Sequence, residues 1–122
     1  MPARFWAVAC FFAQISCSSS SVNKAVRLTG GDTGKGASAI YRFGCGSCHT
    51  IPGIPGAHGL VGPSLAQIAD RQYVAGIMPN DATSLELWIR DPHALNANTV
   101  MPTLGVGEQE ATDIAAYLYS LK

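Results

Sequence analysis

The chain has 122 residues, which is enough for one domain and a leader segment but too few for two separate hydrophobic cores. Eight basic and eight acidic residues give a formal net charge of zero, so no broad basic surface for nucleic acid is expected. From position 30 onward there are five basic and eight acidic residues, so this part is mildly acidic and suits a basic docking partner. Only two of the four cysteines lie in this part, which excludes a disulfide-rich scaffold.

Residues 1–21 are predicted to be an export signal. A short basic start at Arg4 is followed by an apolar run from Phe5 to Ile15 and then by small polar residues. This run is shorter than the roughly 20 residues that a membrane-spanning helix needs. The protein is therefore expected in the periplasm or at the outer face of the cytoplasmic membrane, with residues 22–31 as a tether to the body at 32–122.

Cys17 indicates which type of signal this is. It follows Gln14-Ile15-Ser16 and resembles the cysteine of a bacterial lipoprotein signal, which is lipidated and becomes the new N-terminus. The match departs from that pattern at Gln14, where leucine is usual. Ordinary cleavage among the neighbouring serines and a retained anchor are the two alternatives.

The body is predicted to be all-α, with about four helices separated by loops rich in glycine and proline. The first helix starts at the N-cap candidates Asp32 and Thr33, and a long loop from Thr50 to Pro63 comes after it. A short second helix is expected from Ser64 to about Asp70. The predicted inner face of the first helix consists of Ala37, Ile40, Tyr41 and Gly44.

Two further helices are expected in the second half of the body. Thr83 and Glu86 have the spacing of a capping box that opens the third helix, and Pro92 stops it. The fourth runs from Glu108 to Leu121, with acidic residues in its first turn as the helix dipole favours. The inner faces of these two helices are predicted to hold Leu85, Trp88, Ile89, Ala111, Ile114, Ala115 and Leu118.

The segment from Cys45 to His49 contains the pattern Cys-x-x-Cys-His. On a helix, thiols three residues apart lie on one face, where they can bond the two vinyl groups of a haem, and the next histidine can bind the iron. The alternatives are a thioredoxin-like thiol pair, a zinc site and a chance match. A thiol pair of that type needs a preceding strand, and zinc needs two more suitably spaced ligands. Neither is visible, so the pattern favours one covalently bound haem c.

Two further residues are predicted to complete the iron site. The carbonyl of Pro63 can accept the Nδ1–H of His49, which would fix the histidine tautomer. Met101 is the candidate for the opposite axial position, since histidine and methionine together suit low-spin electron transfer. Met78 is the alternative methionine. The alternative histidine ligands are His58 and His93.

Three residues are candidates for holding the porphyrin itself. The guanidinium of Arg71 suits a propionate carboxylate, while Tyr73 and Trp88 offer an apolar ring with a polar tip. Trp88 also fits an ordinary core position, and Arg71 fits a surface charge next to Asp70.

These motifs resemble the class I cytochrome c family over residues 32–122. The family's attachment, proline and axial-ligand motifs match Cys45-x-x-Cys48-His49-Thr50, Gly62-Pro63-x-Leu65 and Met101-Pro102. The resemblance implies that the stretch Ala115-Ala116-Tyr117-Leu118 crosses the first helix near Gly36 or Ala37, and that Arg71 binds a propionate. It implies the cytochrome c fold around one haem.

The segments His49–Ala57 and Trp88–Pro92 are similar to cytochrome c domains of subunit II of bacterial terminal oxidases. The copper-binding part of such subunits is absent from this sequence, so a stand-alone domain is expected. The resemblance implies an electron-transfer protein of a respiratory chain, not an enzyme, with a terminal oxidase and an upstream cytochrome or dehydrogenase as partners. The alternatives are a permanent haem subunit of an exported dehydrogenase or oxidase, and an open-site haem protein that binds gas or turns over peroxide.

The lipoprotein interpretation of Cys17 predicts metabolic labelling of the exported protein with a palmitate analogue. The Cys17→Ser variant should lose the label, because it removes the acylated thiol. The measurement is in-gel detection of the analogue. Unlabelled wild-type protein, cleaved among the serines instead, would contradict this interpretation.

Overall fold

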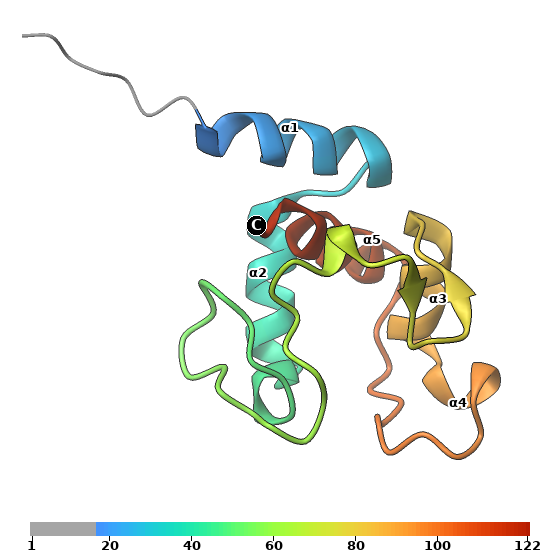
Figure 1. Cartoon of the computed structure of the whole chain (residues 1–122). Helices are drawn as coiled ribbons and strands as arrows, with labels where there is room; N and C mark the ends of the chain where they lie inside the picture. The colour runs from blue at the N-terminus through green and yellow to red at the C-terminus, as the bar shows by residue number, and fades with distance from the viewer. Residues whose placement is uncertain (1–16) are drawn as a thin grey trace, which may run out of the picture.

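The computed structural model describes residues 17–122, so most of the expected export signal lies outside the described residues. The elements are α1 (Cys17–Thr29), α2 (Thr33–Arg42), η1 (Cys45–Ser47), η2 (Ile68–Asp70), β1 (Tyr73–Val74), β2 (Met78–Pro79), α3 (Ala82–Arg90), α4 (Pro92–Leu95) and α5 (Glu108–Ser120). Here η marks a short 3-10 turn, and β1 and β2 form a small antiparallel pair. The expected all-α class is confirmed, with this strand pair as an addition (Figure 1).

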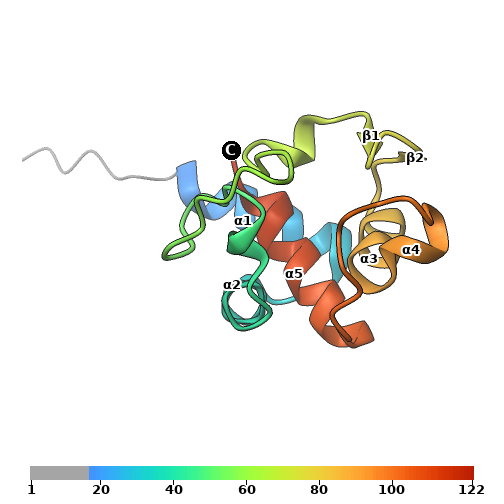
Figure 2. The same ribbon diagram turned by 90° about the horizontal axis from the view of Figure 1, so that it is seen from below.

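Helix α5 is the central element of the fold. It contacts α1, α2 and α3, and Figure 2 shows it between α2 and α3. Small side chains on its buried faces let the neighbouring helices approach closely, since alanine adds little bulk to a helix surface. The predicted inner face is confirmed, because its four members are all buried: Ala111, Ile114, Ala115 and Leu118.

The crossing of α2 over α5 depends on Gly36. A Cβ atom at this position would lie 2.0 Å from the carbonyl oxygen of Asp113, so no larger residue fits without separating the helices. The crossing also decides which side of α2 is buried, namely Gly36, Ala39 and Ile40. The predicted inner face was therefore wrong at Tyr41, which is 66% exposed, and at Gly44, which is exposed and follows the end of the helix.

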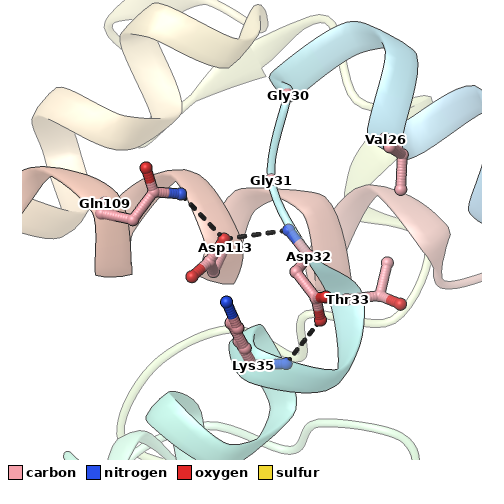
Figure 3. Close-up of a pocket in the computed structure, with 8 residues that line it drawn as sticks. All are labelled: Val26, Gly30, Gly31, Asp32, Thr33, Lys35, Gln109 and Asp113. Atoms are coloured by element: carbon pink, nitrogen blue, oxygen red, sulfur yellow. Dashed lines mark hydrogen bonds between the residues drawn. The ribbon is translucent and has the colours of Figure 1, made fainter.

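The start of α2 is held by a hydrogen-bond network with α5 (Figure 3). The side chain of Asp32 accepts from the Lys35 N–H at 2.8 Å, which confirms Asp32 as the N-cap. Asp113 is buried, and its Oδ1 accepts from the Asp32 N–H at 2.9 Å and from Gln109 Nε2 at 3.0 Å. A surface hollow of about 450 Å³ lies here, at the opposite end of α2 from the cysteine motif.

Two predicted helix boundaries were wrong. The expected helix from Ser64 to Asp70 is only the turn η2, because Gln67 has a left-handed backbone conformation (φ 56°) that a helix cannot include. Helix α3 is capped by Asp81, not by Thr83, since the Asp81 carboxylate accepts from the Ser84 N–H at 2.8 Å.

The segment that we expected to be a tether, 22–31, is helical as far as Thr29. It forms most of α1, which packs on α5 and has Ala25 buried. Between residues 17 and 122, none of the helices is both long enough and apolar enough to span a bilayer. The division into signal, tether and body stays a prediction.

Replacing Gly36 with alanine should lower the free energy of unfolding by about 3 kcal/mol, because the new methyl group collides with the backbone of α5. Urea denaturation measures this loss. Gly34→Ala on the same helix is the matched control: its Cβ would approach only the Asp32 carboxylate, at 3.3 Å. It should gain up to about 1 kcal/mol from helix propensity. Equal losses in both variants would contradict the close crossing.

Candidate functional site

The two cysteines of the motif lie within one turn of the chain. Helix α2 ends before Gly44, whose left-handed conformation (φ 72°) redirects the chain into η1. The N–H groups of Cys48 and His49 both donate to the carbonyl oxygen of Cys45, at 3.2 and 3.1 Å. Both thiols are free and half-buried. Burial raises the pKa of the Cys45 thiol, and the neighbouring Cys48 adds to this, while a backbone hydrogen bond opposes it.

Glycines hold the following loop tightly against this turn. A Cβ on Gly46 would lie 2.7 Å from Ala57, and one on Gly59 would lie 2.5 Å from the carbonyl carbon of Cys48. The Gly59 N–H donates to the Gly46 carbonyl at 3.0 Å. Sequence reasoning did not identify these two glycines as site residues, because a glycine-rich loop does not show which glycine has a close neighbour.

The imidazole of His49 is fixed from two directions. Its Nδ1 lies 2.7 Å from the carbonyl oxygen of Pro63, so Nδ1 carries the proton and Nε2 is the unprotonated nitrogen that could bind a metal. A Cβ on Gly62 would lie only 2.4 Å from Cε1 of the ring. The Gly62 N–H in turn donates to the Cys48 carbonyl at 2.7 Å, which ties the 62–63 segment to the motif.

The two candidate methionines lie in different environments. Met78 pairs with Val74 in the strand pair and packs against the hydrophobic core. Met101 is half-buried in the loop between α4 and α5, and its N–H donates to Thr99 Oγ1 at 3.2 Å. Met78 therefore already has a structural role in the core, which leaves Met101 as the better candidate for an axial ligand.

Helix α4 supports the loop that contains Met101. The Asp91 carboxylate caps α4 by accepting from the Ala94 N–H at 3.1 Å, and it also accepts from the Thr103 hydroxyl at 3.3 Å. The same hydroxyl lies 3.3 Å from Nδ1 of His93, so this histidine already has a partner. His58 is exposed and forms a backbone bridge with Thr50.

The residues predicted to hold a porphyrin lie in different environments. Arg71 is exposed, and its Nη2 donates to the carbonyl oxygen of Ser64, directly after Pro63. Tyr73 is exposed on β1. Trp88 is half-buried on α3 and packs against the core, as its alternative interpretation anticipated.

Two loops at one end of the molecule expose apolar side chains that would fit a flat, covalently attached group such as a haem. The loop after His49 (green) and the chain from α4 to α5 (orange) both lie at the end of the molecule away from α1 (Figure 1). Both expose large apolar side chains that a flat apolar group could cover; Leu60 is 88% and Val100 82% exposed. Residues 17–122 contain no group of three His, Cys, Asp or Glu side chains placed to hold a bare metal ion.

Comparison with known proteins gives one family and two relatives. The model of the family described as "Cytochrome c" matches residues 35–122. A cytochrome c oxidase subunit 2 of Alkalihalophilus pseudofirmus is 34% identical over 89 residues, 72% of this chain and 25% of the relative. A protein of the same name from Bacillus sp. strain PS3 is 32% identical over 92 residues, 72% of this chain and 26% of the relative. The chain thus spans about a quarter of these relatives, and no solved structure gives a significant match.

Replacing Gly62 with alanine should displace the His49 imidazole from the Pro63 carbonyl, because the added methyl group would overlap the ring. The 15N chemical shift of His49 Nδ1 reports the loss of this hydrogen bond. Gly56→Ala in the same loop is the control: it has no neighbour within 4 Å and adds only left-handed backbone strain (φ 71°). An unchanged Nδ1 shift in the Gly62 variant would contradict the geometry.

Proposed function

The chain belongs to the cytochrome c family, whose covalently bound haem transfers electrons, and we propose that it carries one electron at a time on a single haem c ligated by His49 and Met101. The observation that carries this proposal is the compact turn in which two free thiols and an oriented imidazole emerge together. Nδ1 of that imidazole bonds the Pro63 carbonyl at 2.7 Å, and its Nε2 is left for the iron.

Each residue of the site has a defined task in this proposal. Cys45 and Cys48 would form the thioether bonds, and His49 would bind the iron through Nε2. Pro63 keeps the imidazole in one tautomer and increases its basicity. The haem supplies an iron that changes between the ferric and ferrous states. Met101 would supply a thioether sulfur to the iron, which would raise the reduction potential and exclude oxygen and peroxide.

Further residues are proposed to hold and shield the ring. Arg71 has five N–H donors, of which one is used on Ser64, so others remain for a propionate carboxylate. Tyr73 and the exposed apolar side chains of the two loops would cover the ring, and Trp88 would support it from the core side.

We propose a terminal oxidase as the electron acceptor in a respiratory chain, and an upstream cytochrome or dehydrogenase as the donor. Support comes from the two relatives, which are cytochrome c oxidase subunits 2. The excess of acidic residues after position 30 suits a short-lived, electrostatically steered contact with a basic partner. The subunit names of the relatives also favour a second candidate, a haem subunit that stays bound to an exported oxidase or dehydrogenase.

The proposed location is the periplasm or the outer face of the cytoplasmic membrane, with Cys17 as a lipid anchor. Helix α1 begins at Cys17 and lies at the end of the molecule opposite the two loops of the site (Figure 1). A lipid at this position would leave those loops, and the haem edge between them, accessible to a partner.

Met101→Ala should abolish the weak near-infrared sulfur-to-iron band of the oxidised protein, because it removes the axial sulfur. The matched control Met78→Ala should keep the band and lose stability instead, by about 1–2 kcal/mol, because it removes a half-buried side chain packed against the core. The measurement is the absorption spectrum of each variant with covalent haem. Retention of the band in Met101→Ala and its loss in Met78→Ala would reverse the ligand assignment. Rapid carbon monoxide binding to the reduced wild-type protein would favour an open site.

A further inference from the structure

Asn80 uses every polar atom of its side chain to join other parts of the chain. Its Nδ2 donates to the carbonyl oxygens of Ile68 and Arg71, both at 2.8 Å. Its Oδ1 accepts from the Tyr119 hydroxyl at 2.7 Å, and its backbone N–H donates to the Gln72 carbonyl at 3.0 Å. The side chain of one half-buried residue therefore connects the C-terminal part of α5 with the segment before β1.

Tyr119 fixes the orientation of this amide. The phenol is half-buried, and burial together with the nearby carboxylates of Asp81 and Glu86 raises its pKa to about 12. It is therefore a neutral donor at physiological pH, and the oxygen of the Asn80 amide must face it. The two amide protons then point to the carbonyl oxygens on the other side.

Arg71 extends the connection to the proximal histidine. Its carbonyl is held by Asn80, while its guanidinium donates to the carbonyl of Ser64. Ser64 follows Pro63, whose own carbonyl accepts the hydrogen bond from His49 Nδ1. A continuous path of hydrogen bonds and covalent links thus leads from the central helix to the imidazole.

We propose that Asn80 and Tyr119 are positioning residues that set the strength of the bond between His49 and Pro63, and thereby the electron affinity of the haem iron. This inference rests on the proposed function, since it needs His49 as the iron ligand. Neither residue has to touch the haem. They hold Arg71 so that its guanidinium keeps the 63–64 segment against the imidazole.

The expected direction follows from the basicity of the ligand. A short N–H to carbonyl bond increases the electron density on the imidazole and so favours the ferric state. Loosening the 63–64 segment weakens that bond. The equilibrium constant for reduction should then rise by about threefold. This is smaller than the roughly 10–100-fold effect of removing a direct hydrogen-bond partner of a ligand.

The test uses the exported protein with its haem and the variants Tyr119→Phe and Asn80→Asp. Tyr119→Phe removes only the hydroxyl. Asn80→Asp keeps the shape but places a carboxylate oxygen against the carbonyls of Ile68 and Arg71, so its effect on the His49 15N shift should be larger. Its new negative charge by itself favours ferric iron, so Tyr119→Phe is the deciding variant for the reduction equilibrium. The readouts are the equilibrium constant for reduction against a fixed reference couple and the 15N shift of His49 Nδ1. Should Asn80→Asp fail to fold, Tyr119→Phe still decides.

Tyr117→Phe is the matched control. Tyr117 lies on the same helix, and its hydroxyl donates to the carbonyl of Pro52 at 2.6 Å, a contact that involves neither Asn80 nor Arg71. It should leave the reduction equilibrium and the His49 signal unchanged. Equal effects of Tyr117→Phe and Tyr119→Phe, or no effect of Tyr119→Phe and Asn80→Asp, would overturn the inference while the haem function stands. A wild-type protein without covalent haem would overturn both.

Discussion

The imidazole of His49 is held by the polypeptide on two sides, by the Pro63 carbonyl at Nδ1 and by the backbone of Gly62 against the ring. The rest of the site is arranged around this fixed position of the ring. The N–H of Gly62 returns to the Cys48 carbonyl, so the segment that orients the histidine is also tied to the turn that presents the thiols. As the proposed iron ligand, an imidazole oriented in advance would lose little freedom on binding.

Helix α5 connects the packing of the fold with the chemistry of the site. Near its start, Asp113 meets Gly36 at the close crossing with α2, whose far end leads into the cysteine motif. Near its end, Tyr119 reaches Asn80 and so the segment that contains Arg71. Helix α1 packs on the same helix, and it lies at the end of the molecule away from the two loops (Figure 1). The core helix thus positions both the turn that presents the thiols and the segment that supports His49, the proposed iron ligand.

Features that depend on residues close together in the sequence could be predicted from it. Features that depend on contacts between distant residues could not. The inner face of α5 follows from helical spacing around Ala111 and Ala115 and is confirmed. The hydrogen bond expected between Pro63 and His49 is present, although the role of both residues in binding haem stays a prediction. Tyr41 was misplaced because the contact of Gly36 with α5 chooses the buried side of α2. Asn80 was not identified because its hydrogen-bond partners are distant in the sequence, and no short motif indicates contacts of this kind.

The central claim is that the motif at Cys45 to His49 is a covalent attachment site for one haem. Mass spectrometry of the proteolytic peptide that contains this motif, taken from protein exported by a host able to attach haem, tests it most directly. The peptide should be heavier by one haem, with both thiols consumed and the addition resistant to extraction with acidified acetone. A folded protein whose peptide carries two free thiols, or a disulfide between them, would contradict it.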